Sequence, residues 1–163
     1  MHKLLIGLTF LIFSFSSPEK VWNSSKTIGI SPAENWLDQS KDDRLTLVLN
    51  SRLFKASLDV STSSDNNWTL DELWDAYVIK GFPDLLLDFS KVDEGKINIK
   101  GREARWLECF HTDHDIRFKQ LVVCFVAHGK LHIIICTALP EYYTEQKSNL
   151  WAMIKSIETK AKA

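Results

Sequence analysis

Three successive apolar segments in the second half of the chain restrict its fold more than any other feature. They cover Glu103–His111, Arg117–Ala127 and Lys130–Ala138, and they are rich in Val, Ile, Phe and Leu. The polar breaks between them, His111–Asp115 and His128–Gly129, are short enough to be hairpin turns. The three segments therefore predict an antiparallel meander of three strands.

Both faces of this meander are expected to be apolar. If the first hairpin is centred near His114 and the second at His128–Gly129, side chains alternate between two faces. One face then carries Trp106, Phe110, Val122, Ile133 and Ile135, and the other carries Leu107, Leu121, Val123, Phe125 and Ile134. A sheet that is apolar on both sides needs a cover on both sides. The expected fold class is therefore α+β, with a mainly antiparallel sheet between two helical layers.

Two segments can supply those helices. Thr69 and Glu72 have the spacing of a capping box, and the apolar residues after them follow a helical stripe of Leu70, Leu73, Trp74, Tyr77 and Val78. Gly81 and Pro83 are expected to end or interrupt this helix. The second predicted helix runs from Pro140, which suits a first helical turn, to about Glu158.

The remaining extended segments are shorter. Arg44–Asn50 and Lys55–Ser61 alternate apolar and polar residues, which predicts two half-buried strands. Leu85–Phe89 and Lys96–Lys100 are expected to be two further extended segments, separated by a turn at Asp93–Gly95.

The N-terminus has the pattern of a secretory signal peptide. A basic start is followed by the apolar run Leu4–Phe15 and by small residues near Ser16 and Ser17. We assign residues 1–17 to the signal peptide, 18–40 to a loosely ordered lead-in and 41–160 to a single domain. The protein is then exported, to a periplasmic or extracellular location. An uncleaved signal segment is the alternative, and it is the only membrane attachment expected.

Export raises the question of whether the three cysteines form disulfides, because disulfides form in oxidising compartments. The predicted register puts Cys124 and Cys136 on opposite faces of the sheet. It puts Cys109 on the face of Cys136 but two strands away, which is too far for a disulfide. We therefore expect three buried thiols.

The sequence offers little catalytic chemistry. Histidines and carboxylates in His111–Asp115 are suitable metal ligands, but their spacing matches no closed zinc signature, and an exposed polar turn explains them better. Neither a nucleophile elbow nor a glycine-rich phosphate loop is present. The net charge of −1 lacks the basic excess of nucleic-acid binders. No catalytic, cofactor-binding or metal residue and no nucleic-acid partner is therefore expected.

The C-terminal half resembles the PsbP-like family, which includes DcrB-type exported bacterial proteins. The resemblance is carried by Gly101–Trp106, by Arg117 with Gln120–Val123, by Cys136–Ala138 and by Ile154–Ile157 at the end of the last helix. It implies an α/β/α sandwich. Members of this family generally act as binding, assembly or chaperone-like modules without enzymatic activity, so the resemblance implies a non-catalytic protein and transfers no site residue.

The expected function is an exported, non-catalytic binding or assembly module with a protein partner. The residues expected to contact the partner are Trp22, Trp36, Trp68, His111, Asp113 and His114. Exposed tryptophans favour this hypothesis. The alternative is a carrier of a small molecule or lipid, which requires an apolar pocket between sheet and helices. A metal-dependent enzyme using His111–Asp115 is a third hypothesis.

Overall fold

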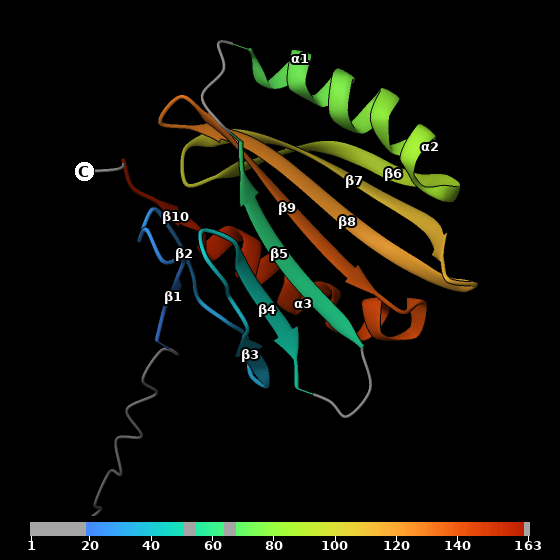
Figure 1. The fold of residues 1–163 in the computed structure, drawn as a ribbon, viewed down its shortest axis with the longest axis horizontal. Coiled ribbons are helices and arrows are strands. Elements are labelled where there is room, and N and C mark those ends of the chain that lie inside the picture. The colour runs from blue at the N-terminus through green and yellow to red at the C-terminus, as the bar shows by residue number, and fades with distance from the viewer. Residues whose placement is uncertain (1–18, 51–54, 64–67, 162–163) are drawn as a thin grey trace, which may run out of the picture.

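The main element of the fold is one antiparallel sheet of seven strands (Figure 1). The computed structural model describes residues 19–50, 55–63 and 68–161, so the predicted signal peptide lies outside the described residues. The strand order is β3-β4-β5-β9-β8-β7-β6. The strands cover Trp36–Asp38 (β3), Leu45–Leu49 (β4), Ala56–Thr62 (β5), Leu87–Ile99 (β6), Arg102–Asp113 (β7), Ile116–Ala127 (β8) and Lys130–Ala138 (β9). The predicted meander is therefore confirmed as β7, β8 and β9.

The register of the first hairpin differs from the prediction by one residue. Asp113 pairs with Ile116, so the turn consists of His114 and Asp115, both with positive φ. A hairpin turn of two residues with positive φ matches the twist of its strands. Trp106 consequently lies opposite Val123, and not on the face of Val122. A slip of one residue moves a whole strand's side chains to the other face, so the predicted membership of the two faces is wrong for β7.

Helices cover both faces of the sheet, as predicted (Figure 1). On one face lies a continuous helix composed of α1 (Leu70–Leu73), the π-helical segment η1 (Trp74–Lys80) and α2 (Gly81–Leu85). On the other face lies α3 (Pro140–Ser156). The predicted capping box starts the first helix, since Thr69 N donates to Glu72 Oε2 at 2.7 Å and Glu72 N donates to Thr69 Oγ1 at 3.3 Å.

The first helix does not stop at Gly81. The Gly81 N–H bonds to the Val78 carbonyl, and α2 continues to Leu85 through Pro83. Pro83 follows a change of helical geometry and lies in the first turn of α2, where a missing N–H is tolerated. Of the two outcomes predicted for this point, interruption therefore describes the helix better than termination.

Each helical layer has its own hydrophobic core. Between α3 and the sheet pack Leu121, Val123, Phe125, Ile134, Cys136, Leu150, Met153 and Ile154. Between the first helix and the sheet pack Leu73, Trp74, Val78, Leu107, Cys109, Val122, Cys124 and Leu131. The expected α+β class, with an α/β/α arrangement of layers, is therefore confirmed.

A single strand, β6, is observed where two short extended segments separated by a turn were predicted before β7. It is one strand of 13 residues, with register irregularities between Leu87 and Ser90 and between Lys91 and Asp93. Gly95 lies within the strand, and a Cβ at this position would be 2.9 Å from Trp106 Nε1. The glycine thus makes room for an indole, and the prediction of a turn at Asp93–Gly95 is wrong.

The segment predicted as a loosely ordered lead-in contributes to a second sheet. Strands β1 (Val21–Trp22) and β2 (Ile28–Ile30) pair with β10 (Glu158–Thr159) in the order β1-β2-β10. All three residues of β2 are buried, and β3 joins the main sheet. The pairing partner of β2 comes from the far end of the chain, so local periodicity gave no sign of it. No helix in the described parts of the chain is long and apolar enough to span a membrane.

Candidate functional site

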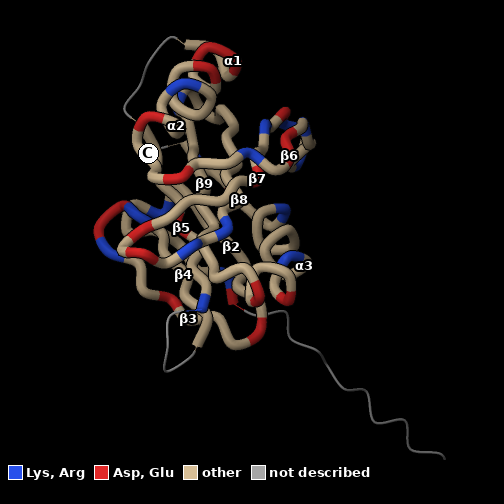
Figure 2. The backbone as a smooth tube through the Cα atoms, turned by 90° about the vertical axis from the view of Figure 1, so that its right-hand side faces the viewer, with Lys and Arg blue, Asp and Glu red and all other residues tan. Residues whose placement is uncertain are grey.

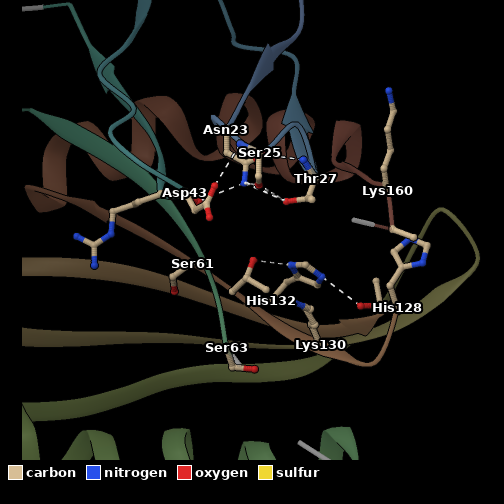
Figure 3. Close-up of a pocket in the computed structure, with 14 residues that line it drawn as sticks. Asn23, Ser25, Thr27, Asp43, Ser61, Ser63, His128, Lys130, His132 and Lys160 are labelled. Carbon is tan, nitrogen blue, oxygen red and sulfur yellow. Dashed lines mark hydrogen bonds between the residues drawn. The ribbon is translucent and has the colours of Figure 1, made fainter. Parts of the chain in front are cut away.

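A polar pocket lies where the small sheet meets the main sheet (Figure 3). Its volume is about 740 Å³, within the range of small-molecule sites. It is lined from segments far apart in sequence: the β1–β2 turn, the start of β4, the end of β5, the β8–β9 turn and the segment after β10. The residues are Asn23, Ser25, Thr27, Asp43, Arg44, Ser61, Thr62, Ser63, Ala127, His128, Lys130, His132, Lys160 and Ala161.

Asn23 holds one wall of the pocket together. Its side-chain amide donates to Ser25 Oγ and Thr27 Oγ1, each at 3.1 Å, and to the Asp43 carbonyl at 3.2 Å. Its Oδ1 accepts from the backbone N–H groups of Thr27 at 2.9 Å and Ile28 at 3.0 Å. Every hydrogen-bonding position of this buried amide is therefore used within the protein, and the Ser25 and Thr27 hydroxyls are held at the wall.

His132 forms the buried base of the pocket. Its Nε2 lies 3.4 Å from the Ala127 carbonyl and its Nδ1 lies 3.1 Å from Thr62 Oγ1. A carbonyl only accepts, so Nε2 carries the proton and Nδ1 accepts from the Thr62 hydroxyl. The ring also stacks on Phe125, with 5.0 Å between centroids. Burial lowers the pKa of His132 to about 4, so the imidazole is neutral at physiological pH.

Among the described lining residues of the pocket, basic side chains outnumber acidic ones. Arg44, Lys130 and Lys160 line it, and Asp43 is the sole acid among its described lining residues. Asp43 Oδ1 accepts from the Ser25 N–H and from Ser24 Oγ, each at 3.1 Å. The Lys160 ammonium lies 4.2 Å from the centroid of the Trp22 ring.

A second feature is the outer helix segment, which we define as Trp68–Val92. Eight large apolar side chains are exposed in the described residues, and six of them lie in this segment: Trp68, Tyr77, Ile79, Leu85, Leu87 and Val92. The rings of Trp68 and Tyr77, each about half exposed, contact one another with 6.4 Å between centroids. The contact between these two half-exposed rings forms an apolar patch of the kind found at interaction surfaces.

The outer helix segment is also acidic. Figure 2 shows acidic positions along α1 and α2. Within this segment the acids are Asp71, Glu72, Asp75, Asp84 and Asp88, and the bases are Lys80 and Lys91. Asp71 pairs with Arg105 at 2.9 Å. The remaining acids leave a negative surface around the exposed apolar side chains.

The tryptophans predicted to contact a partner lie in three different environments. Trp68 is exposed and Trp22 is half-buried. Trp36 is buried, and its Nε1 donates to Gln146 Oε1 at 3.4 Å. The expectation that Trp36 is exposed is therefore wrong, because β3 pairs with β4 and turns the ring toward α3.

The predicted His/Asp loop does not exist as one unit. Strand β7 extends to Asp113, so His111 is a buried strand residue whose ring stacks on Phe118 at 5.7 Å between centroids. Asp113 and His114 remain exposed at the turn, with His114 Nδ1 and Asp113 Oδ1 2.9 Å apart. No group of three or more metal-ligating side chains occurs among the described residues. His111 is thus removed from the surface that a partner can reach.

The three cysteines are free and buried. In the observed register the Cys109 side chain lies on the same face of the sheet as Cys124, and Cys136 lies on the other face. The prediction that Cys109 shares a face with Cys136 is therefore wrong. Burial raises the pKa of Cys109 to about 11 and that of Cys124 to about 12, and it also raises the pKa of Cys136. The thiolate form that nucleophilic chemistry needs is therefore not populated near neutral pH.

Sequence reasoning missed the pocket residues. Asn23, His132 and Lys160 come from three distant segments, and the first of these segments was predicted to be loosely ordered. A local signal was present, since Asn23 followed by Ser25 and Thr27 is typical of a side-chain-stabilised turn. That pattern predicts the turn but not the strands that surround it.

Comparison with known proteins identifies the fold. No protein-family model matches the chain, and no curated protein matches it either. Among solved structures, the chain is similar to CyanoP of Synechocystis sp. PCC 6803, with 12% identity and a TM-score of 0.64 over 95% of this chain and 99% of that one. It is similar to the Saccharomyces cerevisiae Ran-binding protein Mog1p, with 12% identity and a TM-score of 0.62 over 86% and 94%. It is also similar to LpqN, involved in cell envelope biogenesis of Mycobacterium tuberculosis, with 11% identity and a TM-score of 0.66 over 88% and 90%.

These similarities define the class of protein. The chain has the Mog1/PsbP-like fold, and the resemblance predicted from its C-terminal half is confirmed. At identities of 11–12% the similarity concerns the arrangement of strands and helices alone.

Proposed function

We propose that the chain is an exported, non-catalytic binding module that docks a protein partner on the outer helix segment. The observation that carries this proposal is the concentration of exposed apolar side chains there, with the Trp68–Tyr77 pair at its N-terminal end. Tryptophan and tyrosine are the side chains that most often dominate protein–protein binding energy. The acids around them favour a partner whose contact surface is apolar with a basic border.

The non-catalytic part of the proposal is supported by the chemistry of the described residues. The three thiols are buried, with pKa values raised by burial, and burial also lowers the pKa of His132, so that its ring is neutral. Neither group is in a position to act as a nucleophile or to exchange a proton with a ligand near neutral pH. Export is supported by the signal-peptide pattern of residues 1–17.

The carrier hypothesis has weaker support. A hollow of about 600 Å³ lies between α3 and the β6–β7 pair, and Trp106 and Trp151 form an edge-to-face contact there, with 5.8 Å between centroids. Its other lining residues include Lys96, Ser148 and Lys155. This mixed lining differs from the predominantly apolar pocket that a lipid carrier requires.

The test is quantitative affinity capture with three forms of residues 18–163 from an extract of the source organism. The forms are the unaltered chain, Trp68→Ser/Tyr77→Ser, and the control Leu37→Ser, which removes an exposed apolar side chain on β3. We expect one protein to be enriched by the unaltered chain and the control and lost with the double variant, with circular dichroism showing all three folded. Equal capture by all three forms would contradict the proposal.

A further inference from the structure

We propose that two copies of the chain associate through the open edge of strand β6, pairing antiparallel about a two-fold axis at Gly95. The surface involved is Asp93–Asn98, which we call the β6 edge. It lies outside the outer helix segment, so the inference does not depend on the docking function proposed above. It rests on the position of β6 in the sheet, the direction of its backbone groups and the order of its charges.

The main sheet ends in two strands of very different length. One edge strand is β3, with three residues, and the other is β6, with 13. Helix α1 packs on β8, and α3 packs on β5, β8 and β9. Figure 2 shows β6 at the margin of the molecule, and the side chains of Glu94, Lys96 and Asn98 are exposed. The β6 edge is therefore accessible to a partner strand.

The β6–β7 hairpin decides which backbone groups of β6 face the open edge. Its strands pair on either side of the two-residue turn Lys100–Gly101, in which both residues have positive φ. In such a hairpin the residues that flank the turn form a hydrogen-bonded pair, and bonded pairs recur at every second residue. The backbone groups of the odd-numbered residues from 95 to 99 thus face β7. Those of Glu94, Lys96 and Asn98 face away from it.

These outward backbone groups have no backbone partner in the described parts of the chain. No backbone hydrogen bond joins Glu94, Lys96 or Asn98 to a described segment other than β7. The Glu94 N–H donates to Asp93 Oδ1 at 2.9 Å, a contact with its own neighbour that a carbonyl of a second strand can replace. The β6 edge therefore offers backbone donors and acceptors to a second strand.

Bulges and charged side chains are the usual means by which an edge strand avoids pairing. In β6 the irregularities lie between Leu87 and Ser90 and between Lys91 and Asp93. From Asp93 to Ile99 every residue pairs in regular succession with β7. The bulges thus disrupt the first half of the strand, and the β6 edge keeps the regular geometry that a ladder with a second strand needs.

The order of the charges favours a second copy of the same strand in one register. With the two-fold axis at Gly95, Glu94 of each copy lies directly opposite Lys96 of the other, which gives two pairs of opposite charge. Moving the axis to Glu94 or to Lys96 sets like charges against one another. At the axis the two glycines meet, so no side chain lies between the strands there.

Ion pairs within each copy continue into this contact. Glu94 Oε1 accepts from Lys91 Nζ at 2.9 Å, and Lys96 Nζ donates to Glu103 Oε1 at 2.9 Å. With Glu94 opposite Lys96, the charges alternate in sign from Lys91 of one copy to Glu103 of the other. The added pairs are exposed, so each is weak, and the dimer belongs to the small, transient class of interfaces.

The experiment measures the mass of residues 18–163 by analytical ultracentrifugation from about 10 μM to about 1 mM, the range suited to a small interface. The test variants are Glu94→Lys and Lys96→Glu, each of which sets like charges opposite one another twice. An equimolar mixture of the two variants restores opposite charges at both contacts between unlike chains. The controls are Glu141→Lys and Lys41→Glu, which make the same charge changes at exposed positions away from β6. Circular dichroism checks that every variant is folded.

We expect the unaltered chain and both controls to approach twice the monomer mass at the highest concentration. Amide hydrogen exchange at Glu94 and Lys96 should slow as the dimer forms. Each test variant alone should dimerise at least about tenfold more weakly, and their mixture should return to the original affinity. A monomer at every concentration, a dimer that both test variants retain, or a mixture that stays monomeric would overturn the inference.

Discussion

Lys147 of α3 reaches the sheet and ion-pairs with the buried Glu108 of β7, with Nζ and Oε1 2.6 Å apart. Lys119 of β8 approaches the other carboxylate oxygen at 3.2 Å. Burial opposes the charged form of Glu108, but the bonds from Lys147 and Lys119 prevail and the pKa of this carboxyl is lowered. The helix is thus joined to the sheet by a charged contact inside an otherwise apolar layer.

Glu108→Gln is expected to destabilise the fold by about 2 kcal/mol, because it removes the negative partner of two ammonium groups near the core. Both lysines are partly exposed and regain some hydration, which limits the loss. Because the folded-state pKa is lowered, the stabilisation from Glu108 is complete above its ordinary pKa of 4.5 and is lost as pH falls below that value. Urea unfolding at neutral and acid pH measures both effects.

The control for this prediction is Glu145→Gln, also a loss of one negative charge but at an exposed position on α3. It should change the free energy of unfolding by less than about 0.5 kcal/mol. If both variants behave alike, the contact between Glu108 and Lys147 does not stabilise the fold as argued.

His132→Gln is expected to flatten the pH dependence of stability between pH 6.5 and about pH 4. The folded-state pKa of His132, about 4, lies below the ordinary value of 6.5, so the unfolded chain binds an extra proton in this interval. The free energy of unfolding is therefore highest above pH 6.5 and falls by about 3 kcal/mol from this residue as pH is lowered to 4. A glutamine does not titrate, so this decline should disappear.

Urea denaturation near pH 7 and near pH 4 measures the decline in each variant. The matched control is His114→Gln, since His114 is exposed at the β7–β8 turn. The control should retain the decline of the unaltered chain. A decline that persists in His132→Gln would show that another group is responsible.

Gly95→Ala is expected to cost about 1–3 kcal/mol, because the added Cβ would lie 2.9 Å from Trp106 Nε1 and the indole must move. Thermal or chemical denaturation measures the loss. Combining Gly95→Ala with Trp106→Phe removes the indole atoms that the methyl group meets, so the double variant should lose less than the sum of the two single variants. Strict additivity would mean that Gly95 is needed for another reason.

The two helices illustrate what could be predicted from local sequence. The Thr69–Glu72 capping box and Pro140 lie at helix starts, and the signals depend on residues three or four positions apart. The three strands of the meander could also be predicted from local sequence, because these segments are longer and more apolar than loops are. These features depend on neighbours along the chain, which a sequence shows directly.

The predictions failed where a distant residue decided the outcome. Gly95 was predicted to mark a turn, but its absent Cβ makes room for Trp106 on the neighbouring strand. The turn between β7 and β8 consists of two residues, His114 and Asp115, so the register differs from the predicted one by one residue. The Cys109 side chain therefore lies on the other face of the sheet from the one predicted. Neither detail can be obtained from periodicity, since both depend on how two strands come together.

The sequence by itself determined the class of the fold. A meander whose two faces are both apolar needs a layer packed against each face, and the chain has two amphipathic helices that can form these layers. Only the tertiary structure decided the sites. Pairing of β2 with β10 brings Asn23 and Lys160 to the same pocket, where the main sheet places His132. Packing of Trp74 and Val78 onto the sheet leaves Tyr77 exposed beside Trp68. The physical reason is that the burial of apolar side chains leaves a periodic pattern in the local sequence, which can be read directly. The residues against which those side chains pack are often distant in the sequence, and the pattern does not identify them.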